Sequence, residues 1–311
     1  GMTMERARLN RSAALASIAV AALLAGLKGW AAWSTGSTAM LGSLADTALD
    51  LIASVATLIG VWIAAQPEDR GHRFGHGKAE AIAAMFQVVL ISISAFSLAF
   101  HAMEQLLAGA RTAAAADGIG VSLVAMAATL ALLAWQRHVL RRTGSLAIAT
   151  DHVHYQSDLL LNLAVILALA LDQYAGVRQA DPVLGLVIAA WLAWGAWRAS
   201  QAALDQLMDK EWPPEKKQRF LAAIPRPPEL RGVHDLRTRT AGDRDFAQFH
   251  IWLDGKLTID QAHKVMDRIE TALAAAFPDV EVFIHADPVG HVDEGLAAPN
   301  VLPGASRGKD S

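Results

Sequence analysis

Six long apolar stretches constrain the fold of this chain more than any other feature of its sequence. A helix needs about 20 residues to cross a bilayer, because it rises about 1.5 Å per residue through a core about 30 Å thick. The stretches that reach or approach this length are Ser12 to Trp33, Thr38 to Ala65, Ala79 to Met103, Gly118 to Trp135, Ser145 to Leu171 and Pro182 to Ala202. Hydrophobic residues make up 53% of the chain and charged residues 18%, which excludes intrinsic disorder. We therefore expect an α-helical membrane protein with six transmembrane helices.

Charge and cysteine content narrow the classes of partner and metal site. With 27 Lys and Arg against 30 Asp and Glu, the chain lacks the basic field that binds nucleic acid, and we expect no nucleic-acid partner. The 311 residues include no cysteine, which excludes disulfides and thiolate metal sites. Any transition metal must therefore be bound by nitrogen and oxygen, and the 11 histidines become candidate ligands.

Basic residues in alternate connections predict the orientation in the membrane. One side holds Arg6, Arg8, Arg11, Arg70, Arg73, Lys78, Arg137, Arg141 and Arg142, and the other holds only Arg111 and Arg178. Connections rich in lysine and arginine remain in the cytoplasm. The count of nine against two predicts that both termini are cytoplasmic.

A change of composition after Asp209 indicates a second domain. Charged residues and prolines begin there and open a short amphipathic helix that ends near Ile224. We expect strands over Val233 to Thr240, Phe246 to Asp254 and Val280 to His285, with a helix from Thr258 to about Phe277 before the last strand. The order αββαβ predicts a small cytoplasmic α+β domain of ferredoxin or metallochaperone type. The expected boundaries are 1–11 for a cytoplasmic N-terminal segment, 12–209 for the transmembrane domain, 210–290 for the α+β domain and 291–311 for a disordered tail.

Two pairs of polar residues lie where hydrocarbon is expected. Asp46 and Asp50 are four residues apart in the second stretch, so they share one helix face, and His154 and Asp158 repeat this spacing in the fifth. Counting about 1.5 Å per residue from opposite ends of the two helices places both pairs near the middle of the bilayer. The four side chains can therefore converge on one point. Lys28, in the outer third of the first helix, is expected to extend its ammonium group toward the membrane surface.

A divalent cation would stabilise three carboxylates and an imidazole that meet in hydrocarbon. Without one, the carboxylates would repel each other and some would stay protonated. One nitrogen and three oxygen ligands suit Zn²⁺ and are tolerable for Cd²⁺, Co²⁺ or Fe²⁺, whereas Mg²⁺ and Ca²⁺ prefer six or more oxygens. Each ligand also binds a proton, so metal and protons compete and their exchange is the expected chemistry. The alternative is that these residues only make hydrogen bonds between helices.

Two other functions remain open on this reasoning. An intramembrane metal-dependent hydrolase would need an open coordination position and a nearby general base, yet no glutamate lies beside Asp46 or His154 in the sequence. A passive metal channel or a sensor would need weak binding, which four ligands do not favour. We therefore expect a secondary active transporter rather than an enzyme.

Several motifs together resemble the cation diffusion facilitator family of bacterial divalent-metal efflux transporters. They comprise Gly42 to Asp46 with Asp50, Arg73 to Glu80, His154 to Asp158 and the αββαβ domain. The resemblance covers nearly the whole chain. It implies a homodimeric exporter of the bacterial inner membrane that exchanges zinc or a similar ion for protons by alternating access, through Asp46, Asp50, His154 and Asp158.

The resemblance also implies further sites. A second metal site maps onto the loop residues Asp69, His72 and His76. Zinc as a regulatory ligand maps onto the C-terminal residues His234, His250, His263, His285 and Asp287. An ion pair near the dimer interface maps onto Lys78 and Asp209.

Overall fold

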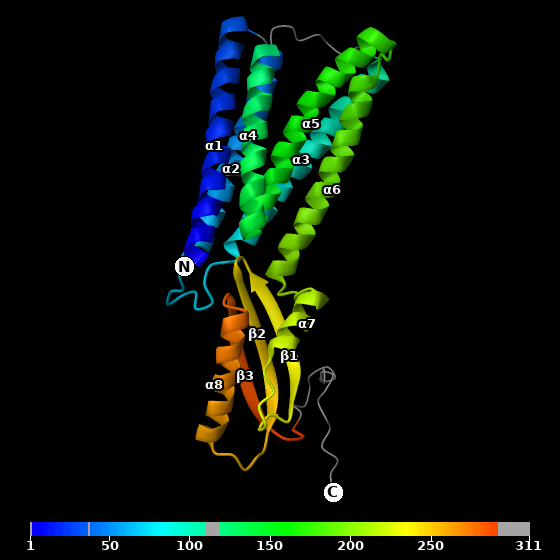
Figure 1. The fold of residues 1–311 in the computed structure, drawn as a ribbon. Helices are drawn as coiled ribbons and strands as arrows, with labels where there is room; N and C mark the ends of the chain where they lie inside the picture. Colours follow the sequence, from blue (N-terminus) through cyan, green and yellow to red (C-terminus); the bar gives the residue numbers. More distant parts are fainter. Residues whose placement is uncertain (1, 37, 110–118, 292–311) are drawn as a thin grey trace. The chain divides into compact units, whose positions relative to one another are not determined.

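The computed structural model describes residues 2–36, 38–109 and 119–291. The chain divides into two compact units, Gly1–Asp205 and Gln206–Ser311 (Figure 1). Apart from His291, the tail that is predicted to be disordered lies outside the described residues.

The first unit contains, within the described residues, six helices that are long and apolar enough to cross a membrane, which confirms the predicted number. They are α1 (Met2–Thr35), α2 (Thr38–Ala64), α3 (Ala79–Ala108), α4 (Ile119–Thr143), α5 (Leu146–Ala175) and α6 (Ala180–Leu207). Helices α1 and α4 extend well beyond their apolar stretches. Charged side chains such as Arg8 and Arg141 are good helix formers, so these helices continue where the hydrophobic pattern ends. Residues 2–11 therefore belong to α1, and a cytoplasmic location for them stays a prediction.

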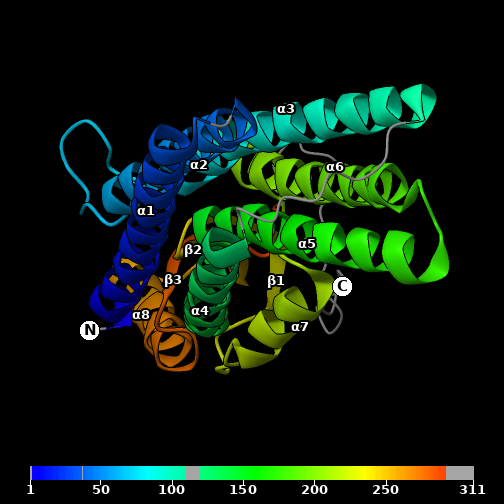
Figure 2. The same ribbon diagram turned by 90° about the horizontal axis from the view of Figure 1, so that it is seen from above.

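Small residues allow the helices of this unit to pack closely. A Cβ atom on Gly60 of α2 would lie 2.4 Å from the Cβ of Ala83 on α3, so only glycine fits at this crossing. Five helices meet in one apolar cluster, formed by Ala13, Ala14, Val61, Ala83, Val139, Ala147 and Ile148. Helices α3, α5 and α6 lie side by side (Figure 2) and share a second cluster that includes Ile91, Val153 and Leu192. This packing fixes the faces of α2, α3 and α5 that carry the polar residues.

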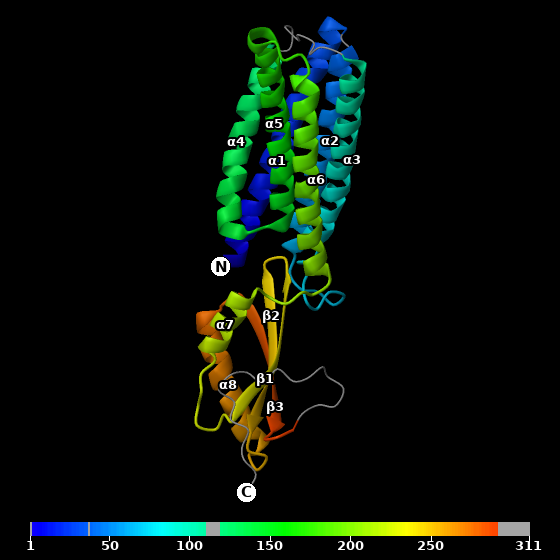
Figure 3. The same cartoon turned by 90° about the vertical axis from the view of Figure 1, so that its right-hand side faces the viewer.

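The second unit has the predicted order αββαβ. Its elements are α7 (Pro214–Ala223), β1 (Gly232–Ala241), β2 (Arg244–Leu253), α8 (Ile259–Ala276) and β3 (Val280–Pro288). The sheet order is β1-β2-β3, with β1 antiparallel and β3 parallel to β2. Helices α7 and α8 cover one face of the sheet (Figure 3), and Phe220 and Ile269 from these helices pack on Phe249 and Ile251 of β2.

The strands of the second unit divide their side chains between two faces. Successive residues of a strand point to opposite sides, so Phe249 and Ile251 face the helices while His250 and Trp252 face away from them. The same alternation places His285 and Asp287 of β3 on the face opposite Ile284. One face of the sheet is therefore an apolar core and the other carries histidines.

Candidate metal centres

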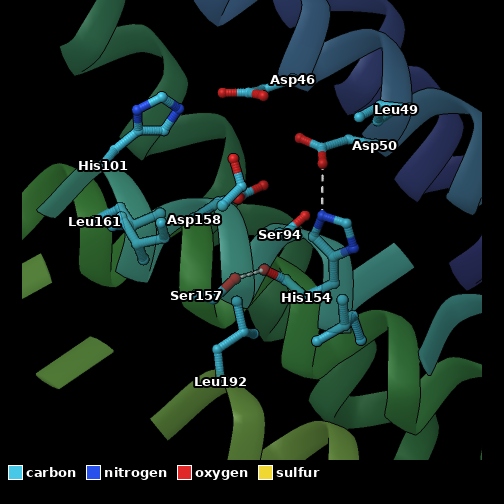
Figure 4. Close-up of a pocket in the computed structure, with 13 residues that line it drawn as sticks. Asp46, Leu49, Asp50, Ser94, His101, His154, Ser157, Asp158, Leu161 and Leu192 are labelled. Carbon is cyan, nitrogen blue, oxygen red and sulfur yellow. Dashed lines mark hydrogen bonds and ion pairs between the residues drawn. The ribbon is translucent and has the colours of Figure 1, made fainter. Parts of the chain in front are cut away.

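A cavity of about 170 Å³ lies among the membrane-spanning helices α2, α3, α5 and α6 (Figure 4). Asp50, His154 and Asp158 line it, and one ligand atom from each of these residues lies within 4.8 Å of the others. His154 Nε2 is 2.5 Å from Asp50 Oδ1. The structure thus brings together three of the four residues predicted for the intramembrane site.

The spacing of His154 and Asp158 explains how α5 supplies two ligands. Residues four apart lie one above the other on a helix, so both side chains enter the same cavity. The His154 side chain is only 7% exposed, and its Nδ1 atom is buried without a hydrogen-bond partner among the described residues. Its Nε2 atom points across to Asp50 of α2, so this nitrogen is the candidate ligand atom.

Asp46 lines the same cavity but does not belong to the cluster of three ligand atoms. It lies one helical turn before Asp50 and its side chain is exposed. Ser94, Ser97 and His101 of α3 also line the cavity, so its wall is partly polar on that side. Among the cavity residues that the structure describes, Asp46 is the remaining aspartate next to the three ligands.

A buried hydrogen-bond network adjoins the cluster and was not predicted from the sequence. Asp151, three residues before His154, is completely buried and accepts hydrogen bonds from Gln87 Nε2 (3.0 Å) and Gln136 Nε2 (2.9 Å). Tyr155 Oη is 2.7 Å from Ser54 Oγ. These bonds connect α5 with α2, α3 and α4. Asp151 shares a face with His154 at the i, i+3 spacing, and this spacing was the available signal.

The loop between α2 and α3 gathers Asp69, His72 and His76, the three residues predicted for a second site. Asp69 Oδ2 is 3.1 Å from His76 Nε2, and Asp69 Oδ1 is 3.3 Å from His72 Nδ1. The two imidazole rings lie 4.5 Å apart. His76 Nδ1 contacts the Gln66 carbonyl oxygen at 3.4 Å, which directs its Nε2 toward the other two side chains.

Backbone N–H groups stabilise the ionised form of the loop carboxylate Asp69. The N–H groups of His72 and Gly71 each donate to Asp69 Oδ1 at 2.7 Å. These bonds lower the pKa of the Asp69 carboxyl group below its usual value, and the bond from the His72 N–H has the largest effect. The Asp69 carboxylate therefore stays ionised to a lower pH than an ordinary aspartate.

The third group of ligands lies on the histidine face of the C-terminal sheet. His234 of β1 pairs with His250 of β2, and His250 pairs with His285 of β3, so the three histidines form a row across the strands. One ligand atom from each of His234, His250 and Asp287 lies within 4.8 Å of the others. We call these three residues the C-terminal cluster. Strand register alone places them together.

Asp287 lies at the centre of this row. Its Oδ2 atom is 2.8 Å from His250 Nδ1 and 3.2 Å from His234 Nε2, and its Oδ1 atom is 3.1 Å from His285 Nε2. Its side chain is only 4% exposed, whereas that of His285 is 53% exposed. Burial, and then the charge of His250, lowers the pKa of His234, which favours the neutral imidazole that binds metal.

His263 does not join the C-terminal cluster. It lies on α8, which covers the opposite face of the sheet, and its Nε2 atom is 3.4 Å from Asp267 Oδ2. The sequence grouped it with the other histidines because they are close along the chain. Two other residues contact the cluster instead. An Asp235 carboxylate oxygen lies 3.6 Å from His250 Nε2, and Trp252 stacks on His234 with ring centroids 4.2 Å apart.

Lys78 and Asp209 belong to different units of the structure. Within its own unit, Asp209 Oδ1 is 3.7 Å from Arg239 Nη1. The ion pair of Lys78 and Asp209 near a dimer interface stays a prediction.

Comparison with known proteins supplies the family. Residues 14–208 match the cation efflux transmembrane domain, and residues 212–289 match the cytoplasmic domain of cation efflux proteins. The chain belongs to the cation diffusion facilitator family. The cation-efflux pump FieF of Serratia proteamaculans is 40% identical over 294 residues, covering 94% of this chain and 98% of the relative. FieF of Shewanella oneidensis is 42% identical over 250 residues, covering 80% and 84%.

A solved structure is similar to the C-terminal part of this cation diffusion facilitator. It is the zinc form of the putative zinc transporter CzrB, with 40% identity, a TM-score of 0.25, and coverage of 27% of this chain and 98% of that chain. The family and the named pumps identify the protein as a multi-pass membrane transporter for the efflux of divalent metal ions. The resemblance seen in the sequence is thereby confirmed.

Proposed function

We propose that this protein exports zinc, or a similar ion such as Cd²⁺, Fe²⁺ or Co²⁺, from the cytoplasm in exchange for protons. The observation that carries the proposal is the meeting of Asp50, His154 and Asp158 in one cavity among membrane-spanning helices. Ionisable groups inside a membrane are costly, and they commonly mark the path of an ion. One imidazole and two carboxylates are ligands that suit a borderline transition-metal ion.

Asp46 is proposed as the fourth ligand of the transport site. It lines the cavity one turn from Asp50, so a change of its side-chain rotamer would bring a further carboxylate to the ion. Four ligands complete the tetrahedral geometry that Zn²⁺ prefers. A site that gains or loses Asp46 would also change its affinity between loading and release.

Protons are proposed as the counter-substrate because they bind the same atoms. His154 Nε2 and the carboxylate oxygens must be deprotonated to bind a metal ion, so each ion that binds displaces protons. In alternating access, the cavity would load the ion from the cytoplasm, open to the other side and exchange the ion for protons there. The proton gradient then drives metal out of the cell.

We also propose roles for the other metal sites and for the assembly, supported by the family. We infer that the C-terminal cluster, with His285 at its exposed edge, binds regulatory zinc and reports cytoplasmic metal, and that Asp69, His72 and His76 hold an ion at the loop. The protein is proposed to act as a homodimer in the bacterial inner membrane with both termini in the cytoplasm. Lys78 and Asp209 would form its interlocking ion pair.

Transport by purified protein in lipid vesicles tests the proposal. With a metal-sensitive dye inside and a pH gradient across the membrane, we expect zinc movement that stops when an ionophore collapses the gradient. Empty vesicles and vesicles with the Asp158→Ala variant serve as controls. Zinc movement that does not depend on the gradient would contradict proton exchange, and no zinc, cadmium, iron or cobalt movement would contradict the substrate class.

A further inference from the structure

Lys28 of α1 is a charged residue within a membrane-spanning helix, and it is not one of the proposed ligands of the transport site. A lysine in such a helix usually extends toward the membrane surface, and this was the expectation from sequence. Its ammonium group instead donates a hydrogen bond to Thr47 Oγ1 of α2 at 2.9 Å. Thr47 is only 1% exposed. The positive charge is therefore anchored between two helices.

This anchor places the charge beside the transport site. Thr47 directly follows Asp46 and precedes Asp50 by three residues, so the ammonium group is held against the part of α2 that supplies the carboxylates. The Lys28 charge acts on Asp46 of α2 and on Asp158 of α5. His101 of α3 lines the same cavity, so an imidazole also lies near these carboxylates.

A fixed cation at this position affects the two states of the site in opposite ways. When the divalent ion is bound, the ammonium group repels it. When the ion has left, three carboxylates line the cavity and the ammonium group offsets part of their mutual repulsion. Both effects lower the affinity for the ion, and the low dielectric of the membrane strengthens them. An exporter needs such a term, because a site that binds too tightly releases its ion slowly.

We propose that Lys28, anchored by Thr47, is a built-in countercharge of the transport site that weakens ion binding and so speeds release. The inference rests on the proposed function of the Asp50, His154 and Asp158 cluster. Lys28 is a positioning residue here, since it acts on the carboxylates and does not bind the ion.

Lys28→Met tests the charge because methionine keeps the length of the side chain and suits a membrane helix. In calorimetry of the full-length protein at about pH 8, where protons compete least, we expect zinc to bind the transport site about tenfold more tightly than in the wild type. The transport site is isolated from the other metal sites by subtracting the signal of Asp50→Ala. In vesicles, we expect KM and maximal rate to fall together.

Two further variants separate charge from structure. Lys28→Arg keeps the charge, so its affinity and rate should stay close to those of the wild type. Thr47→Val keeps the charge but removes its anchor, and we expect a smaller change in the direction of Lys28→Met. Arg178→Gln removes a cation from the connection between α5 and α6, away from the cavity lining, and should change neither quantity.

The outcomes distinguish this inference from the proposed function. Wild-type affinity and rate in Lys28→Met would overturn the countercharge, as would weaker binding in that variant. Equal changes in Lys28→Arg and Lys28→Met would assign the effect to shape or hydrogen bonding and would also overturn it. Wild-type protein that neither binds nor moves any of the four metals would instead contradict the proposed function.

Discussion

The intramembrane cluster and the C-terminal cluster combine the same two ligand types in opposite surroundings. Asp50, His154 and Asp158 come from two helices and line an open cavity. His234, His250 and Asp287 come from three strands whose backbones are hydrogen-bonded in register. Helices that pack through alanine and glycine can shift past one another, whereas paired strands hold their side chains at fixed separations.

This difference suits the two clusters to the different tasks proposed for them. A transport site must change its ligand set or its access between loading and release, and Asp46 lies in the cavity beside the three ligands. A regulatory site must keep its geometry so that occupancy depends on metal concentration alone. In the C-terminal cluster the Asp287 carboxylate contacts the imidazoles of His234 and His250, and also that of neighbouring His285, which pre-organises the ligands before any ion binds.

The largest effect is expected when a carboxylate of the intramembrane cluster is removed. Asp50→Ala or Asp158→Ala should reduce zinc transport in vesicles at least about hundredfold, because the remaining ligands no longer enclose the ion. The protein should stay folded, and the zinc binding proposed for the C-terminal cluster should still be seen in calorimetry. Asp172→Asn, a carboxylate of α5 that does not line the cavity, is the matched control. Retained transport in Asp50→Ala would break the assignment of the site.

Substitutions in the C-terminal cluster should affect zinc binding there and leave the transport site unchanged. His250→Ala should weaken zinc binding at this cluster by about tenfold to hundredfold while the transport site keeps its affinity, because His250 is central in the row. His285→Ala should weaken it less, since this side chain lies at the exposed edge. His263→Ala should have no effect, because its ring contacts Asp267 on α8. Calorimetry in which His263→Ala and His250→Ala lose the same site would contradict the cluster.

The imidazole of His154 should determine which metal ion the transport site prefers. His154→Asp exchanges a nitrogen ligand for an oxygen ligand, so preference should move about tenfold away from zinc toward manganese or cadmium. Competition between metals during vesicle transport measures this shift. An unchanged competition profile would show that His154 does not touch the ion.

The smallest predicted effect is a pH dependence of stability in the C-terminal domain. Burial lowers the pKa of His234 in the folded state, so the unfolded chain binds more protons once the pH falls below about 6.5, the usual histidine value. The free energy of unfolding should therefore decrease below that pH in metal-free protein, and the decrease should be smaller in His234→Gln. Urea unfolding followed by tryptophan fluorescence between about pH 7.5 and 5 measures the difference. An identical slope in both proteins would contradict the origin assigned to it.

Sequence reasoning predicted what depends on local pattern. Apolar length predicted the six spanning helices, and the i, i+4 spacing predicted that His154 and Asp158 share a face. The helix ends extend further than predicted because charged residues continue a helix beyond the hydrocarbon. Asp151 and its two glutamine partners were missed because hydrogen bonds between helices depend on packing that no local pattern contains.

The resemblance named the residues of the C-terminal cluster, but strand register shows why their pairing could not be predicted from the sequence. Counting back from the pair Ala241 and Arg244 would place His234 opposite Ile251. A bulge between His234 and Arg237, with Asp235 at a φ of 50°, shifts the register by one residue and pairs His234 with His250 instead. The C-terminal cluster depends on this one irregularity.

Anomalous X-ray diffraction at the zinc edge, from crystals of the full-length protein grown with zinc, tests the central claim most directly. We predict a peak in the cavity within about 2.0–2.2 Å of His154 Nε2 and of carboxylate oxygens from Asp50 and Asp158. A cavity without a peak at saturating zinc, or an ion bound by only one of these residues, would contradict the account.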